Sequence, residues 1–123
     1  MSAYEKVVQS AAEKLMEDEQ LRSNLTDDEA NILVNWAIEW LEGRVTKARD
    51  EAAARQMALA EAARLRVVMQ KINGLLAEDK TPTVALALKT LGLGPATATS
   101  TSLDRKALVR SLTAQLTRAW GKQ

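Results

Sequence analysis

The feature that most constrains the fold of this chain is a long stretch, residues 26–79, that contains no proline and only two glycines, Gly43 and Gly74. It opens with a clear helix start, because Thr26 is a good N-cap and Glu29 completes a capping box. Apolar side chains then recur at helical spacing at Ala30, Val34, Ala37, Leu41, Val45, Ala48 and Ala52. The pattern predicts a helix whose apolar face must lie against another element.

Two arrangements of this stretch fit the pattern. The apolar phase passes Gly43 without a break, which favours one long central helix over about residues 27–78, since a glycine inside a helix costs only about 1 kcal/mol. Such a helix is about 75–80 Å long, whereas the radius of gyration of a domain of this size is about 14 Å. A second subunit therefore has to cover it. Against continuity, the core positions in the middle of the heptad pattern are charged: Arg44, Glu51 and Arg55. We favour the continuous helix and keep a kink or break within residues 43–56 as the alternative.

The segments on either side of the long stretch also indicate helices. Residues 3–21 carry one apolar stripe, and Ser2 with Glu5 forms a capping box at its start. A short helix over residues 82–91 begins at Pro82, which suits the first helical position.

The C-terminal part is predicted to be a linker followed by a last helix. Gly92 is a helix stop, and residues 93–102 are small side chains that predict a flexible linker. An amphipathic helix follows over about residues 103–120. We therefore expect an all-α protein, a bundle of four to five helices that forms one domain over residues 1–123.

The composition argues against most enzyme chemistry. The chain has no cysteine and no histidine, which removes thiolate nucleophiles, the commonest general base and the commonest transition-metal ligands. The carboxylates Asp27, Asp28, Glu29, Glu39 and Glu42 indicate capping and a solvated face, with an all-carboxylate magnesium site as the less favoured reading. We expect no enzymatic activity, no cofactor and no metal. The sequence has no apolar run long enough to span a membrane, and we expect a cytoplasmic protein.

Charge is distributed unevenly along the chain. Residues 1–42 contain three basic and ten acidic residues, a net charge of −7, whereas residues 43–123 carry +8. Opposite charges on the two halves favour docking of one half on the other, either within one chain or between two copies. A charged partner is the alternative.

Two tryptophans on the long stretch suggest a partner surface. Trp36 and Trp40 are four residues apart and lie in a row with Leu33, next to the stripe that contains Leu41. One reading is a flank of the core that the first helix shields. The other is an interface anchored by tryptophan, which is enriched at such sites. The leading hypothesis is a non-enzymatic helical interaction or assembly protein that self-associates through the long amphipathic helix as a homodimer. A different protein partner is the further option, and the expected interface is Leu33, Trp36, Trp40 and Leu41.

The alternative function is a nucleic-acid-binding regulator that uses residues 80–123. This part contains seven basic residues and one acidic residue, and its candidate phosphate contacts are Arg105, Lys106, Arg110 and Arg118. The segment TVALALKTLGLGPATAT loosely resembles a helix-turn-helix motif, although its second helix lacks side chains that read base edges. The last helix is also basic and ends in a tryptophan, a pattern compatible with a membrane surface. We favour ordinary packing of that helix on the bundle.

Overall fold

The computed structural model describes residues 3–77, 84–93 and 104–121. These residues form five α-helices and one short 3-10 helix and contain no strand, which confirms the predicted all-α bundle. The elements are α1 (Ala3–Glu17), the 3-10 helix η1 (Glu19–Leu21), α2 (Asp27–Val45), α3 (Glu51–Leu75), α4 (Val84–Thr90) and α5 (Arg105–Gly121). The predicted cap at Ser2, the helix start at Pro82 and the linker from residue 94 onward lie outside the described residues.

The preference for one continuous helix is wrong. The chain reverses between Val45 and Glu51, inside the window in which the alternative expected a break, and α2 and α3 form a hairpin. The reversal has a clear start signal that the apolar phase obscured. Asp50 is the N-cap of α3, and its Oδ1 accepts a hydrogen bond of 2.8 Å from the backbone N–H of Ala53.

The unbroken apolar phase across the reversal is a coincidence of two separate stripes. Val45 ends the stripe of α2 and is fully buried, whereas Ala52, which the single-helix pattern turns inward, is exposed. The buried face of α3 instead begins at Ala54. Each helix therefore presents its own apolar face to the core.

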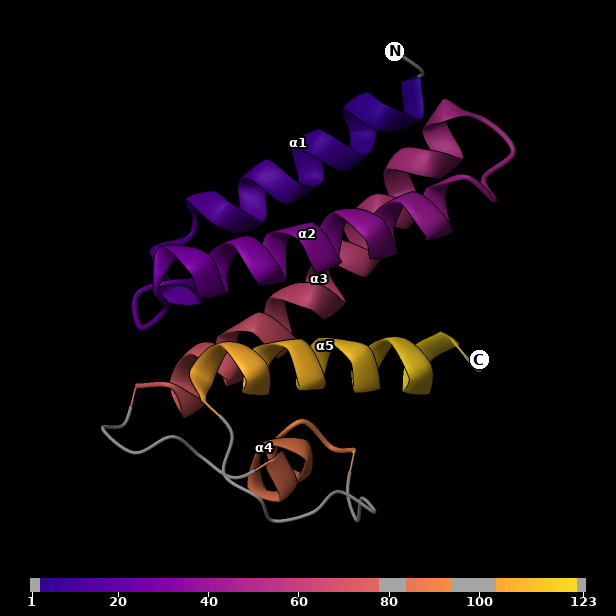
Figure 1. Ribbon diagram of the computed structural model, residues 1–123. Helices are drawn as coiled ribbons and strands as arrows, with labels where there is room; N and C mark the ends of the chain where they lie inside the picture. The colour runs from indigo at the N-terminus through magenta and orange to yellow at the C-terminus, as the bar shows by residue number, and fades with distance from the viewer. Residues whose placement is uncertain (1–2, 78–83, 94–103, 122–123) are drawn as a thin grey trace.

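The first three helices form the body of the bundle (Figure 1). α1 and α2 run in opposite directions, and so do α2 and α3, so that α1 and α3 run parallel to each other. Contacts at both ends agree with this direction. The Tyr4 hydroxyl donates to the Ala48 carbonyl at 3.3 Å, and Asp18, just after α1, forms an ion pair with Arg66 on the later part of α3.

The connection between α1 and α2 is tied to the end of α3 by a buried asparagine. The Asn73 side chain donates to the Gln20 carbonyl at 2.9 Å and to the Ser23 hydroxyl at 3.1 Å. Its Oδ1 accepts from the Asn24 backbone N–H at 2.8 Å. Asn73 is only 6% exposed, and a buried amide side chain is stable only when its polar atoms have hydrogen-bond partners. These three hydrogen bonds supply such partners.

α5 completes the bundle by lying along α2, and α4 packs on α5 and α3 (Figure 1). The start of α2 is the strongest local prediction, and the structure confirms it. The Thr26 backbone N–H donates to Glu29 Oε1 at 2.9 Å, and the Glu29 N–H donates to the Thr26 hydroxyl at 3.2 Å. This capping box also fixes the Glu29 carboxylate where α5 begins.

Candidate functional site

The predicted interface row lies in the core of the single chain. Leu33 and Leu41 are fully buried, and Trp36 and Trp40 are 7% and 9% exposed. α5 packs against the two tryptophans of the row: the ring centre of Trp120 lies 5.9 Å from that of Trp36 and 5.3 Å from that of Trp40. These four residues therefore have their packing partners within the chain and are not a surface patch.

The polar edges of the two predicted tryptophans are also satisfied within the chain. The Trp36 indole N–H donates to the Thr117 hydroxyl at 2.8 Å, and the Trp40 indole N–H donates to Glu61 Oε2 at 2.8 Å. Buried indole groups normally find such partners.

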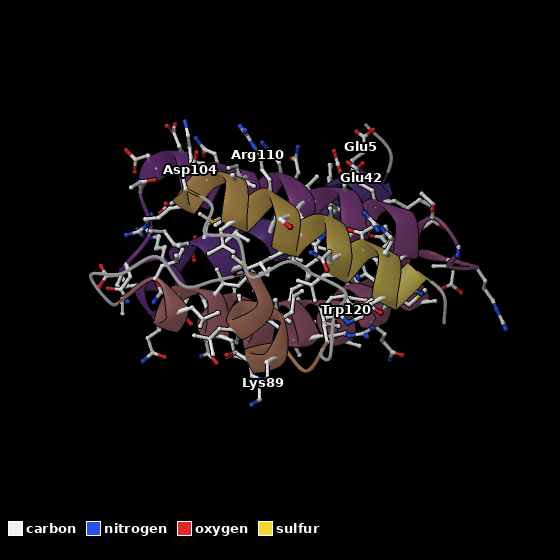
Figure 2. The ribbon with its side chains drawn as sticks, turned by 60° about the horizontal axis from the view of Figure 1, so that its bottom comes forward. Glu5, Glu42, Lys89, Asp104, Arg110 and Trp120 are labelled. Carbon is white, nitrogen blue, oxygen red and sulfur yellow. The ribbon has the colours of Figure 1, made fainter. Side chains whose placement is uncertain are left out.

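Two arginines complete the tryptophan cluster. The guanidinium of Arg44 lies 4.5 Å from the ring centre of Trp40, and that of Arg64 lies 3.8 Å from the ring centre of Trp120. Both are within the range of a cation–π interaction. Arg44 also donates to the Trp120 carbonyl at 3.4 Å. Trp120 near the end of α5 is thus held by α2 and α3 together (Figure 2).

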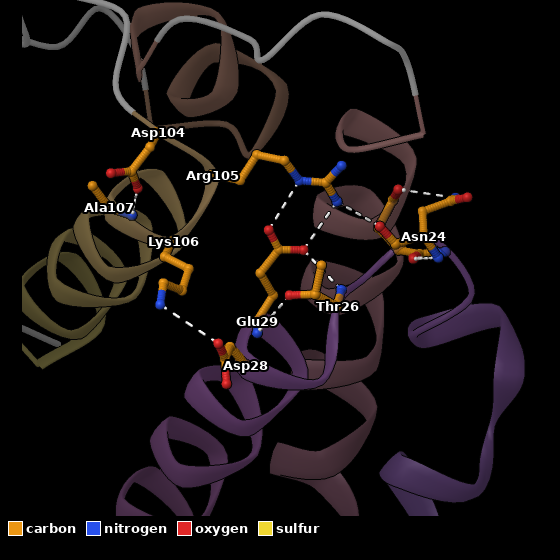
Figure 3. Close-up of polar contacts among 9 residues, drawn as sticks. Asn24, Thr26, Asp28, Glu29, Asp104, Arg105, Lys106 and Ala107 are labelled. Atoms are coloured by element: carbon orange, nitrogen blue, oxygen red, sulfur yellow. Dashed lines mark hydrogen bonds and ion pairs between the residues drawn. The ribbon is translucent and has the colours of Figure 1, made fainter.

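Two of the four predicted phosphate contacts are engaged inside the molecule (Figure 3). Arg105 binds the Glu29 carboxylate through two hydrogen bonds of 2.9 Å and donates to the Asn24 carbonyl at 2.6 Å. Lys106 Nζ lies 3.5 Å from Asp28 Oδ2. The acidic start of α2 and the basic start of α5 therefore meet within one chain, as the charge distribution favoured.

The other two predicted cations, Arg110 and Arg118, are exposed on α5. Figure 2 shows Arg110 at the opposite edge of the view from Lys89 on α4, so these two cations do not lie on one face. Arg118 borders a small hollow of about 210 Å³ together with Leu93 and Gln115. Of the four predicted phosphate contacts, Arg105 and Lys106 therefore pair with carboxylates, and Arg110 and Arg118 are exposed.

A groove that the sequence did not predict lies between α1 and α3. Its volume is about 620 Å³, and no residue of α2, α4 or α5 borders it. Its floor and walls are mainly apolar and small: Val7, Ala11, Leu15, Ala58, Leu59, Ala62 and Ala63. Alanines on both helices leave space between their backbones that larger side chains would fill.

The groove continues into an exposed apolar stripe of α3. Leu59 is 64% exposed and Val67 is 50% exposed, and Ala63 lies between them on the same face. Together with Leu86, Leu59 and Val67 are the large apolar side chains exposed in the described residues. The signal for this stripe was present at the spacing 59, 63 and 67, but a single long helix assigned the apolar face to the other side.

Cations border the groove on both sides. Lys6 and Lys14 come from α1, Arg55 and Arg66 come from α3, and Glu51 is the one acidic residue that lines it. Arg55 pairs with Glu51 at 2.7 Å and Arg66 pairs with Asp18. Among the described residues, no ion pair engages Lys6 or Lys14. Of the four cations that line the groove, the two on α1 are thus the ones without an ion pair among the described residues.

Within residues 3–77, 84–93 and 104–121, no cluster of three acidic side chains is placed to hold a metal ion. In the same part of the chain, none of the helices has the length and apolar character that crossing a bilayer requires.

The fold and the groove define an all-α bundle with one face closed by aromatic packing and one face open. Comparisons of the chain with protein-family models, with curated proteins and with solved structures found no match.

Proposed function

We propose that this protein is a non-enzymatic helical interaction protein that binds a helix of another polypeptide in the groove between α1 and α3. The observation that carries the proposal is the exposure of Leu59, 64%, on the wall of an apolar groove of about 620 Å³. Exposed apolar patches with a polar rim are typical of interaction sites. An amphipathic helix laid into an apolar groove is a recurring mode of recognition.

The dimensions of the groove suit a helix. Its lining runs from Glu51 to Arg66 on α3, fifteen residue steps, which correspond to about 22 Å of helix. A docked helix of about four turns matches that length. Alanines on the floor let the backbone of a docked helix approach closely, and Leu59 offers a large apolar contact beside it.

The proposal keeps the interaction class that the sequence suggested and moves its surface. The predicted interface row is buried within one chain: Leu33, Trp36, Trp40 and Leu41. The proposal therefore does not use a dimer anchored on that row. A dimer that joins two grooves brings two cationic rims together, which disfavours it. Binding of a different polypeptide fits the groove better than binding of a second copy.

Composition supports the non-enzymatic part of the proposal, since the chain has neither histidine nor cysteine. The cytoplasm remains the proposed location, because a chain without cysteine needs no oxidising compartment for its stability. The nucleic-acid alternative is not advanced, since Arg105, one of its candidate contacts, binds the buried Glu29 carboxylate.

A titration followed by NMR tests the proposal. A peptide of about 18 residues with a Leu/Ala stripe and glutamine at the flanking positions represents an amphipathic helix without charge bias. Added to ¹⁵N-labelled protein, it is expected to shift the amide resonances of residues 6–15 and 51–66. The matched variants are Ala63→Trp, which fills the groove, and Ala114→Trp at an exposed position of α5 outside it.

Binding that persists in Ala114→Trp and disappears in Ala63→Trp supports the groove as the site. Shifts that spread over α5, or that are unchanged in Ala63→Trp, contradict it. The absence of any shift at millimolar peptide also contradicts the proposed function.

A further inference from the structure

We infer that the helix that docks in the groove is acidic, with carboxylates along the edge of its apolar stripe that face α1. This inference rests on the proposed function and names the chemistry of its partner. It is carried by the cations that border an otherwise apolar groove: Lys6, Lys14, Arg55 and Arg66.

The α1 edge supplies two cations, Lys6 and Lys14, at a helical spacing. Lys6 and Lys14 both line the groove and are eight residues apart, which corresponds to about 12 Å along α1. Both side chains are exposed, and no ion pair holds either one among the residues that the structure describes. Two carboxylates seven or eight residues apart on a docked helix are separated by about the same distance, 11–12 Å.

The α3 edge is a weaker source of selectivity, because its cations already have partners. Arg55 pairs with Glu51 one turn earlier, with side chains 68% and 51% exposed. A pair this exposed contributes little and exchanges easily with an incoming carboxylate. Arg66 is held by Asp18 and is 40% exposed. Selectivity for an acidic helix is therefore expected to come mainly from α1.

A second copy of this chain does not supply the required helix. α2 carries exposed acids at Glu39 and Glu42, but the large exposed apolar side chains of the described residues lie on α3 and α4. An acidic helix of this chain thus lacks the apolar anchor that the groove accepts. The lining also argues against a nucleic acid, because phosphates gain nothing from an alanine floor and an exposed leucine.

Three peptides test the charge preference by isothermal titration calorimetry at low salt. All three share one Leu/Ala stripe and differ at the flanking positions, which hold glutamate, glutamine or lysine. Because two exposed ion pairs are involved, the glutamate peptide is expected to bind about three- to tenfold more tightly than the glutamine peptide. The lysine peptide is expected to bind most weakly, and the differences shrink as salt is added.

Charge reversal of the α1 edge sharpens the test. The double variant Lys6→Glu/Lys14→Glu is expected to invert the preference, so that the lysine peptide binds better than the glutamate peptide. The matched control is Lys47→Glu/Lys71→Glu, which makes the same change of net charge at exposed lysines that do not line the groove. The control is expected to retain the preference for glutamate. Circular dichroism of both variants confirms that the fold is kept.

The outcomes separate the inference from the proposed function. Equal binding of all three peptides overturns the acidic partner and leaves helix docking intact. No binding of any peptide overturns both. An unchanged preference in Lys6→Glu/Lys14→Glu overturns the assignment to α1. If vesicles of phosphatidylserine and phosphatidylcholine bind the protein through Lys6 and Lys14 and the peptides do not, the site serves an anionic membrane and the inference is wrong.

Discussion

Two faces of the molecule, one between α2 and α5 and one between α1 and α3, have the same composition, an apolar stripe bordered by charged residues. They differ in how far that stripe is covered. On the first face, Trp120 packs on Trp36 and Trp40, and each indole N–H of that pair has an acceptor. On the second face, small side chains leave a groove, and Leu59 is 64% exposed. Among the described residues, the tryptophans of the closed face have packing and hydrogen-bond partners, whereas Leu59 on the open face is largely exposed.

The difference shows what separates a core from a candidate docking surface in a small helical protein. Both faces contain apolar side chains and cations. On the closed face the cations are used, since Arg64 covers Trp120 and Arg105 binds Glu29. On the open face Lys6 and Lys14 border apolar surface without ion pairs in the described residues. The open face is therefore distinguished by cations that have no ion pair among the described residues, and not by its apolar character alone.

The largest expected effect that tests this comparison is the loss of Trp120. Trp120→Ala removes a side chain that is 8% exposed and that contacts two other tryptophans. A loss of about 3–5 kcal/mol in the free energy of unfolding is expected, since truncation of a buried tryptophan leaves a large cavity. Chemical denaturation followed by circular dichroism measures it. A loss below about 1 kcal/mol, the size expected of a surface substitution, contradicts a closed α2–α5 face.

An intermediate effect is expected at the ion pairs that dock the start of α5. Arg105→Met leaves the buried Glu29 carboxylate, 2% exposed, without its main partner. Removal of one partner from a buried pair costs about 3–5 kcal/mol, and because Arg105 itself is 35% exposed we expect a lower value, about 2–3 kcal/mol.

Lys106→Met is the matched control for this change. Its partner Asp28 is 72% exposed, and an exposed pair contributes about 0–1 kcal/mol. The same denaturation measurement compares the two variants. Equal losses in Arg105→Met and Lys106→Met indicate that Glu29 is solvated and that the buried pair does not hold α5.

The smallest effect is expected on the open face. Leu59→Ala removes an apolar side chain that is largely in solvent, so the free energy of unfolding is expected to change by less than about 0.5 kcal/mol. The same variant is expected to weaken binding of every peptide that uses the groove, as calorimetry measures. A marked loss of stability in Leu59→Ala makes this residue part of the core and removes the contrast between the two faces.

The all-α fold and the capping of α2 could be predicted from the sequence, because both depend on local signals. Helical spacing, Thr26 with Glu29, and a chain without strand patterns are sufficient for them. The sequence could predict the window in which a chain reversal fits, residues 43–56, but not that the chain does reverse there. Asp50 is an N-cap signal for a new helix, but the continuous apolar phase favoured one long helix. In the structure, the buried positions of Val45 and Ala54 belong to two separate helices.

The candidate site could not be predicted, because it depends on which faces remain uncovered. Trp36 and Trp40 have the character of interface anchors, and only the position of Trp120, about eighty residues later in the chain, shows that they are covered. The groove, in turn, owes its space to four lining alanines, which carry no distinctive signal in the sequence. Its cations come from two helices whose parallel alignment follows from two successive reversals.

The tryptophan cluster has a consequence for how this protein is observed. The chain contains three tryptophans, and Trp36, Trp40 and Trp120 all belong to the cluster. Indole emission therefore reports the separation of α5 from α2, while no indole borders the groove between α1 and α3. A helix that enters the groove is expected to leave the emission spectrum unchanged. Intrinsic fluorescence is thus an unlabelled monitor of one face of the molecule and is silent about the other.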